Sequence, residues 1–247
     1  MEGAGGAGPP IAATSDIHSP RFLPGFLRSL GGTGDNPALI LLAGDIVDRG
    51  RWRECTRVVE PIMSRWPGTP IVAVYGNEEY DDVKDKIRRA CSAARWLDDE
   101  YIVVSLSGLE VGIIGTRGVL DRPTPWQARH IPGIAGIYRR RLERLRELIS
   151  ESKRSDDMTL LLTHYPPRSA TLEGEDPRFW QQMSSTRLAK IVEEMGVDVV
   201  IHGHLHRSRV HDAALGPSRV YNVAFPAVEE IRMIRLEHRR GILGFLG

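Results

Sequence analysis

The sequence predicts an α/β fold built on a mostly parallel sheet that is covered by helices. Short apolar runs of strand type occupy residues 9–16, 37–45 and 70–77. Helix-like segments at about 21–30 and 51–66 separate these runs. Strands that alternate with helices in this way are typical of parallel sheets. Two apolar runs around Ser107-Gly108, within 101–116, predict an antiparallel hairpin, so we expect mixed strand directions.

The second half continues the alternation after a long interruption. Residues 118–136 are rich in Pro and Gly and predict a long loop, a type of segment that is usually functional or disordered. A basic helix is expected at 137–153 and a further helix at about 184–196. Between and after these helices we expect strands that end at His164 and near His204. The C-terminus predicts one more strand and then a possible hairpin within 229–246.

Length and composition indicate one large domain. With 247 residues, 41% of them hydrophobic, the chain can bury one sizeable core. We expect a flexible segment at 1–9 and a single domain at 10–247. A net charge of +1 gives no general attraction to nucleic acid or to an acidic membrane. No apolar run approaches 18 residues and no signal-peptide pattern is present, so we expect no membrane span.

The cysteines Cys55 and Cys91 lie in separate helix-like segments, far apart in the sequence. They form no C-x-x-C pair, and two cysteines make no disulfide framework. We therefore expect no disulfide and a cytoplasmic location.

Most of the predicted strands end in side chains that can bind a metal ion. The motifs are SDIH with Asp16 and His18, GDIVDRG with Asp45, GNEE with Asn77, THYPP with His164, and GHLH with His204 and His206. In open α/β sheets, ligands bind at the carboxyl ends of the strands. The i, i+2 spacing of Asp16 with His18, and of His204 with His206, places each pair on one face of an extended segment.

The chemistry of this set favours two first-row transition metal ions. Three oxygen ligands and four imidazoles, without a cysteine, suit Mn, Fe, Zn or Co. Seven ligands are too many for one ion but suit two ions that share a bridging carboxylate. Two ions about 3.5–4 Å apart can activate a bridging hydroxide and hold a phosphoryl group.

Each motif alone has a simpler explanation. D-x-H in a loop carries little information, a single His is more often structural, and GDIVDRG could be an ordinary helix start. The five motifs together, in this order and each at a strand end, favour a metal centre over these alternatives.

As a set, the motifs resemble those of the calcineurin-like metallophosphoesterase superfamily, over residues 16–206. The resemblance implies a four-layer αββα sandwich of two mixed sheets flanked by helices. It also implies ligand roles. The first metal would be bound by Asp16, His18, Asp45 and His206, the second by Asn77, His164 and His204, with Asp45 bridging. Asp48 would orient a ligand from behind, or simply cap a helix.

The sequence departs from the family at one position. Members usually carry a His after the Asn, which donates to the leaving oxygen or the phosphate, and here that residue is Glu78. A carboxylate near a phosphate repels it unless protonated or bound to metal. Glu78 either acts as a protonated acid or turns away and leaves the role vacant, and we favour the second. Glu79 matches the acidic position of the family.

The expected activity is a metal-dependent phosphoesterase, acting on a small phosphate ester or nucleotide with diesters slightly favoured. Its expected catalytic residues are Asp16, Asp45, Asn77, Glu78 and His164. Arg117 and Arg122 are candidates for contacts with the substrate phosphate. The alternatives are an inactive scaffold that keeps the fold, motivated by Glu78, and a nuclease or nucleic-acid binder, which the net charge does not favour. The sequence does not define the oligomeric state.

Overall fold

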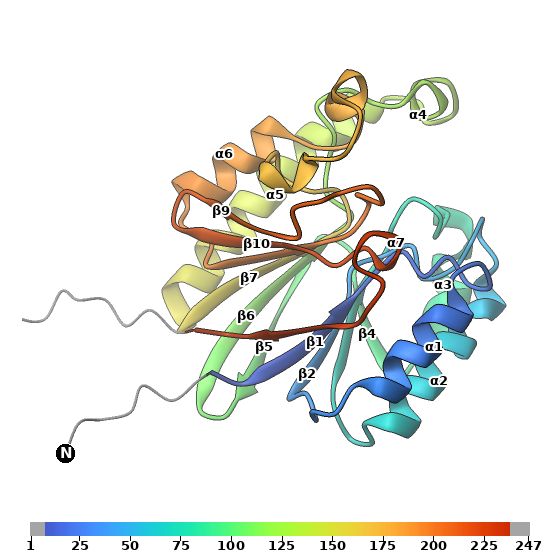
Figure 1. Cartoon of the computed structure of the whole chain (residues 1–247). Helices are drawn as coiled ribbons and strands as arrows, with labels where there is room; N and C mark the ends of the chain where they lie inside the picture. Colours follow the sequence, from blue (N-terminus) through green and yellow to red (C-terminus); the bar gives the residue numbers. More distant parts are fainter. Residues whose placement is uncertain (1–7, 238–247) are drawn as a thin grey trace, which may run out of the picture.

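The computed structural model describes residues 8–237, which form four layers (Figure 1). Two β-sheets pack face to face, and helices cover the outer face of each sheet. This is the predicted αββα sandwich with two mixed sheets. Among the described residues, no helix is long and apolar enough to cross a membrane.

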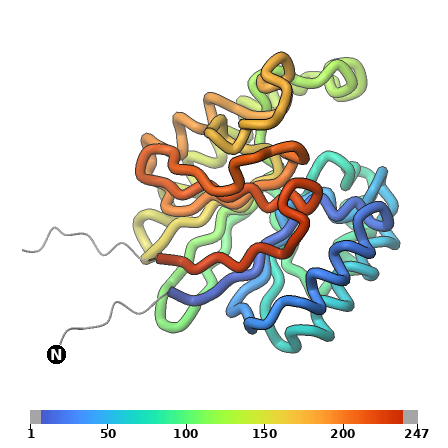
Figure 2. The backbone as a smooth tube through the Cα atoms, viewed as in Figure 1, coloured from blue at the N-terminus to red at the C-terminus, as the bar shows by residue number. Residues whose placement is uncertain are grey.

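The first sheet has the strand order β11-β1-β2-β3-β4. Its strands are β1 (Pro10–Thr14), β2 (Leu39–Leu42), β3 (Ile71–Val74), β4 (Ala94–Leu97) and β11 (Arg232–Arg235). Strands β1 to β4 run parallel, and the continuous apolar sequences of β1, β2 and β3 fit strands that are buried on both faces. The antiparallel β11 closes the edge against β1, so the first and last strands within residues 8–237 lie side by side (Figure 2).

The second sheet has the order β5-β6-β7-β8-β10-β9. Its strands are β5 (Glu100–Leu106), β6 (Leu109–Thr116), β7 (Met158–Thr163), β8 (Val199–His202), β9 (Asp212–Leu215) and β10 (Ser218–Asn222). The pairing of Leu106 with Leu109 around Ser107-Gly108 confirms the predicted hairpin. The four central strands are parallel, and β5 and β9 add antiparallel edges.

Helices cover the two outer faces and also connect the strands. The elements are α1 (Leu23–Gly32), η1 (Trp52–Cys55), α2 (Thr56–Arg65), η2 (Asp81–Val83), α3 (Lys84–Ala90), α4 (Pro125–His130), α5 (Ile134–Ser155), η3 (Ala170–Leu172), η4 (Pro177–Gln182), α6 (Thr186–Glu194) and α7 (Phe225–Val228). Helices α1 to α3 lie on the first sheet, and α5 and α6 lie on the second (Figure 1). The short helix α4 projects from the body of the molecule.

Three buried clusters hold the layers together. The central one lies between the sheets and includes Leu41, Val72 and Leu162. The other two pack the sheets against their helices, for example through Phe26 of α1 and Leu145 of α5. The packed sheets are therefore rigid, and they fix the positions of the residues that follow each strand.

The expectation of unbonded cysteines is wrong. Cys55, at the end of η1, and Cys91, directly after α3, form a disulfide within the layer that covers the first sheet. Both residues are buried there. The sequence separation of 36 residues gave no sign of this contact, because it arises only when α3 packs beside η1. The cysteines thus lend no support to a cytoplasmic location, which stays a prediction.

Other boundaries differ from the sequence expectation. The predicted loop at 118–136 contains α4, whose start is capped by reciprocal hydrogen bonds between Thr124 and Gln127. The proposed C-terminal hairpin is replaced, within the described part, by β11 pairing with β1, and residues 238–247 lie outside the described residues. The flexible segment expected at 1–9 lies outside them up to residue 7.

The central cluster predicts a specific loss of stability. Leu41 is fully buried between the sheets, so Leu41→Ala should lower the free energy of unfolding by about 2–5 kcal/mol through lost burial and a residual cavity. Urea denaturation of the metal-free protein would measure it. Leu27→Ala on α1 is the matched control, because Leu27 is 40% exposed and its loss should cost less than about 0.5 kcal/mol. Equal losses for the two variants would contradict this assignment of the core.

Candidate functional site

The carboxyl ends of strands from both sheets meet at one edge of the sandwich. Asp16 follows β1, Asp45 follows β2 and Asn77 follows β3, all in the first sheet. His164 follows β7 and His204 follows β8 in the second sheet. The parallel strands explain the convergence, since each delivers its following loop to the same edge.

Asp16 is the centre of the first group of ligand atoms. Its Oδ1 lies 2.8 Å from His206 Nε2 and 3.7 Å from His18 Nε2. Its Oδ2 accepts hydrogen bonds from the Ser15 hydroxyl and from the His204 backbone N–H. Asp16 is completely buried, so its carboxylate has left bulk water for a site made by these partners.

Asp45 and His164 form the second group together with Asn77. His164 Nε2 lies 3.4 Å from Asp45 Oδ2 and 3.1 Å from Asn77 Oδ1. The other ring nitrogen, Nδ1, lies 3.0 Å from the Ala43 carbonyl oxygen, and this partner requires the proton on Nδ1. Nε2 is thereby left as a free lone pair directed at the carboxylates. The His204 ring lies 5.0 Å from the His164 ring and completes this side.

His18 provides the test of whether the residues fit metal ions. Both of its ring nitrogens are buried without a hydrogen-bond partner among the described residues. Nε2 lies 3.7 Å from Asp16 Oδ1 and 3.7 Å from Asp45 Oδ2, as expected for ligands around a shared ion. A buried, unsatisfied imidazole is costly, and a cation at this point would satisfy it. The donor set therefore fits first-row divalent ions.

The ligand atoms fall into two overlapping groups. One consists of Asp16, His18 and His206, and the other of Asp16, Asp45 and His164. Asp45 also lies within 3.7 Å of His18, so both carboxylates lie between the two sets of imidazoles. The structure brings all seven predicted ligands to one edge. The number of ions and the division of ligands between them stay predictions.

Electrostatics at the site favour a bound cation. Burial raises the pKa of the Asp45 carboxyl well above its usual value, and the charges of Glu79 and Asp16 raise it further. Burial also opposes the charge on Asp16, but the nearby imidazoles of His18 and His206 outweigh it and hold the pKa of Asp16 well below its usual value. Burial lowers the pKa of His164 to about 4, so this imidazole is neutral at pH 7, the form that binds metal.

The backbone is strained where the ligands begin. Asp16, His18, Asp45 and His204 have φ values of 55°, 41°, 50° and 72°, in the left-handed region that non-glycine residues rarely adopt. Such conformations cost about 1–3 kcal/mol each and persist where the surrounding structure enforces them. Gly76 leaves room for the conformation of Asp45, because a Cβ at position 76 would collide with the Asp45 carboxylate. The sequence shows this glycine but not the backbone strain that it accommodates.

Glu79 fixes the two loops that carry Asp45 and Asn77. Its fully buried carboxylate accepts hydrogen bonds from the backbone N–H groups of Gly76, Asp45, Ile46 and Val47, at 2.7 to 3.0 Å. Burial raises its pKa, and these four donors oppose the rise. The sequence indicated only that Glu79 matches the acidic position of the family, and the structure shows that it joins the loops after β2 and β3.

The Glu78 carboxylate is held by hydrogen bonds from two neighbouring loops. One carboxylate oxygen accepts the backbone N–H of Arg49 at 2.9 Å, and the other accepts from Asn77 Nδ2 at 3.2 Å. Its own backbone N–H donates to Asp45 Oδ1 at 2.7 Å. The main chain of Glu78 thus supports the site, while its side chain is held by a neighbouring loop.

The two candidate phosphate contacts lie in different surroundings. Arg117 donates to the Glu79 carbonyl oxygen at 2.9 Å and pairs with Asp81 at 3.2 Å, which binds it to the loop after β3. Arg122 is exposed, in the segment that leads to α4. Asp48 Oδ1 lies 3.9 Å from His18 Nδ1, the position expected of a residue that orients this imidazole. The role of each in binding substrate or ligand stays a prediction.

His202 is a buried histidine that the ligand set does not include. Its Nδ1 donates to the Gly203 carbonyl oxygen and its Nε2 lies 3.1 Å from the Thr171 hydroxyl, so both nitrogens are satisfied. Burial lowers its pKa to about 4. These contacts fit the packing role that its place in β8 suggests.

Comparison with known proteins points to one family. The sequence model of the calcineurin-like phosphoesterases matches residues 9–208. A search of curated protein sequences finds no match.

Solved structures share the fold at low identity. The phosphopantetheinyl hydrolase of Mycobacterium tuberculosis has a TM-score of 0.63 at 16% identity, covering 93% of this chain and 96% of its own. The protein TT1561 of Thermus thermophilus has a TM-score of 0.59 at 16% identity, and the match covers 92% of this chain and 99% of TT1561. The NAD nucleotidase of Haemophilus influenzae has a TM-score of 0.53 at 14% identity, and the match covers 92% of this chain and 54% of the nucleotidase. At these identities the likeness concerns the fold alone.

The position of Glu79 predicts a change in metal affinity. In Glu79→Gln, an amide NH₂ would face two backbone N–H donors and lose both hydrogen bonds, loosening the loops that hold Asp45 and Asn77. We expect Mn²⁺ affinity to fall roughly 10–100-fold, as for other residues that orient ligands. Calorimetric titration of the metal-free protein measures it.

The adjacent Glu78→Gln is the matched control. Its carboxylate accepts one backbone N–H and one side-chain N–H, so its replacement should change the affinity by less than about threefold. Wild-type affinity in Glu79→Gln would show that the loops keep their geometry without this carboxylate.

Proposed function

Because the chain belongs to the calcineurin-like phosphoesterase family, we propose that it hydrolyses phosphate mono- or diesters at a centre of two metal ions. The observation that carries the proposal is the unsatisfied His18 imidazole, which faces both buried carboxylates of the site. Without a cation, both buried nitrogens of His18 would remain unsatisfied, which is costly. Diesters are slightly favoured as substrates, and the cytoplasm is the proposed location.

The ligand assignment follows the seven residues at the sheet edge. The first ion would be held by Asp16, His18, Asp45 and His206, and the second by Asn77, His164 and His204, with Asp45 shared. Mn, Fe, Zn or Co suits these oxygen and imidazole donors. When bound, such ions supply a water-derived nucleophile at neutral pH and neutralise charge on the phosphoryl group.

The protein's own residues position and protect this centre. The Ala43 carbonyl holds His164 in the tautomer that frees Nε2. Glu79 fixes Asp45 through the backbone, and Glu78 N–H donates to Asp45 Oδ1 and orients its carboxylate. The burial of Asp16 and Asp45 keeps water from competing with their contacts. With the Glu78 side chain held by Arg49, no side chain at position 78 is available to protonate the leaving group.

The proposed substrates are small phosphate esters or nucleotides. Two proteins of similar fold are named for such chemistry, a phosphopantetheinyl hydrolase and an NAD nucleotidase, which supports the class but not a particular compound. The net charge of +1 does not favour a nucleic-acid substrate. An inactive scaffold is the second candidate, because Glu78 occupies a catalytic position. The presence of all seven ligands favours the enzyme.

Metal dependence tests the proposal. Bis(p-nitrophenyl) phosphate and p-nitrophenyl phosphate should be hydrolysed with Mn²⁺ and should not be hydrolysed after chelation. Asp45→Asn should lower kcat/KM by roughly 100-fold or more, since several kcal/mol of charge stabilisation depend on the ligand carboxylate. Asp35→Asn, at an exposed position, is the control and should match the wild type. If elemental analysis finds no metal in the purified protein and neither ester is hydrolysed, the inactive scaffold is favoured.

The orientation of Glu78 predicts a preference for good leaving groups. Since position 78 lacks a proton donor, the wild type should hydrolyse p-nitrophenyl esters far better than phenyl or alkyl esters. Glu78→His should raise the rates on the poor leaving groups by about tenfold or more, because general acid catalysis is worth 10²–10⁴ in favourable cases. A series of esters with graded leaving-group pKa values measures this.

Glu78→Gln separates the new proton donor from the loss of charge. It should leave the dependence of rate on leaving-group pKa as steep as in the wild type. If Glu78→His gains nothing on the poor leaving groups, the role is either filled by another residue or not needed.

A further inference from the structure

A solvent-open groove of about 1180 Å³ lies between α1 and the segment that runs from α7 to β11. Its floor is closed at two points. At the first, Phe225 packs so closely on Gly25 of α1 that a Cβ added to Gly25 would lie only 3.0 Å from the Phe225 ring. At the second, the Ile231 backbone N–H donates to the Ser29 hydroxyl at 2.8 Å. Helix α1 has ten residues, so the groove follows it for about 15 Å. This length and volume suit a molecule of nucleotide size.

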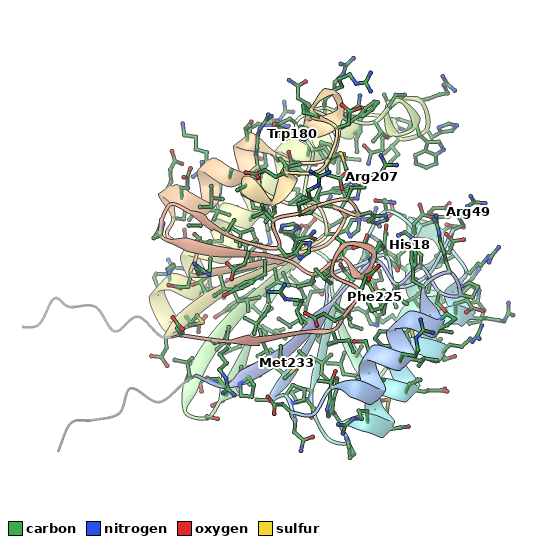
Figure 3. All side chains as sticks on the ribbon, viewed as in Figure 1. His18, Arg49, Trp180, Arg207, Phe225 and Met233 are labelled. Atoms are coloured by element: carbon green, nitrogen blue, oxygen red, sulfur yellow. A yellow bond between two sulfur atoms is a disulfide. The ribbon has the colours of Figure 1, made fainter. Side chains whose placement is uncertain are left out.

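One end of the groove reaches the metal-ligand cluster. Phe22 lines the groove, and its ring lies 6.3 Å from the ring of His18, edge to face. Arg21, also in the lining, has its guanidinium 5.0 Å from the centre of the Phe22 ring. Figure 3 shows His18, Phe225 and Met233 succeeding one another from the site along this side of the molecule. A substrate whose phosphate lies at the cluster can therefore extend into the groove.

The lining combines ring-binding surfaces with unpaired positive charge. The half-buried Phe22 and Met233 offer an aromatic and a thioether surface, and Phe225 is buried beneath them in the core that packs on α1. Three arginines, Arg21, Arg28 and Arg232, line the groove, and within residues 8–237 none of them forms an ion pair or a side-chain hydrogen bond. Free guanidinium groups are suited to bidentate contacts with a phosphate.

The acidic residues of the groove lie on the wall that faces α1. Glu229 and Glu230 follow α7 and share this wall with Arg232, whereas Arg21 and Arg28 belong to the segment around α1, which carries no acidic lining residue. An anionic group is thus directed to the α1 wall. The carboxylates can accept hydrogen bonds from sugar hydroxyls or from the N–H groups of a base.

We propose that this groove is a binding subsite for the remote part of the substrate, and that this part is a nucleoside-like group that carries a second phosphate. The inference rests on the proposed phosphoesterase function, since the first phosphate is placed at the metal centre. The base and sugar would lie against Phe22 and Met233, and the second phosphate would contact Arg28 on α1.

Binding of product-like nucleotides tests the subsite without turnover. The probes are thymidine 3′,5′-bisphosphate and thymidine 5′-monophosphate, titrated by calorimetry into the Mn²⁺-loaded protein. The wild type should bind the bisphosphate roughly tenfold more tightly, the value of a charge-assisted hydrogen bond. Arg28→Ala should remove most of this difference and leave the affinity for the monophosphate unchanged. Arg28→Lys should keep part of it, and Arg89→Ala on α3, also exposed, should change neither affinity.

Two adjacent glycines provide a steric test with a matched control. Gly31 and Gly32 both end α1, neither has a left-handed φ, and a Cβ at either position meets open space. Only Gly32 lines the groove. Gly32→Trp should therefore fill the far end and weaken the bisphosphate, while Gly31→Trp should bind both nucleotides as the wild type does.

Hydrolysis separates failure of the subsite from failure of the function. In thymidine 5′-(p-nitrophenyl phosphate), with or without a 3′-phosphate, water supplies the new oxygen on phosphorus. The bond from phosphorus to the aryl oxygen breaks, and p-nitrophenolate leaves. The 3′-phosphate should raise kcat/KM roughly tenfold. If neither ester is hydrolysed but the bisphosphate still binds more tightly, the proposed function fails and the subsite stands.

The proposal is overturned by equal affinities for the two nucleotides in the wild type. It is also overturned if Gly32→Trp and Gly31→Trp behave alike, because the groove would then not contact the ligand.

Discussion

The buried carboxylate of Glu79 is the contact on which the site depends. Four backbone N–H groups from the loops after β2 and β3 point at this single side chain. The loops approach so closely that Gly76 has no room for a Cβ beside Asp45. Without a charged acceptor between them, these donors would be buried and unsatisfied, at a cost of about 1–3 kcal/mol each. Glu79 thus converts two strand ends into a fixed frame for Asp45 and Asn77.

The predicted metal-ligand cluster holds two carboxylates whose negative charges repel each other. Two buried carboxylates, Asp16 and Asp45, lie within reach of the same His18 nitrogen, and burial together with neighbouring charge raises the pKa of Asp45. Left-handed backbone at both aspartates adds strain. Packing of the two sheets stabilises this arrangement, and a bound cation would turn its repulsion into attraction. The favourable packing of the core therefore offsets the unfavourable charges and backbone strain at the carboxyl ends of the strands.

Much of the fold could be predicted because its signals are local. Apolar runs marked β1, β2 and β3, and the polar residues after them marked the site. The missed elements depend on tertiary contacts. In β4, the exposed Arg95 interrupts the apolar pattern. The disulfide of Cys55 with Cys91 requires α3 to pack against η1, and the grip of Glu79 requires two loops to meet. No spacing along the sequence encodes these approaches.

The antiparallel pairing of β11 with β1 brings together two stretches that lie far apart in the sequence. All seven predicted ligands fall within the family match at 9–208, whereas one wall of the groove, from Phe225 to Met233, comes after it. Strand β11, the last strand of the described residues, pairs with β1, whose following loop carries Asp16 and His18. One wall of the proposed subsite is thus encoded outside the stretch that carries the predicted ligands, whereas the α1 wall lies within it. A change within 225–233 would alter one wall of the groove without replacing a predicted ligand.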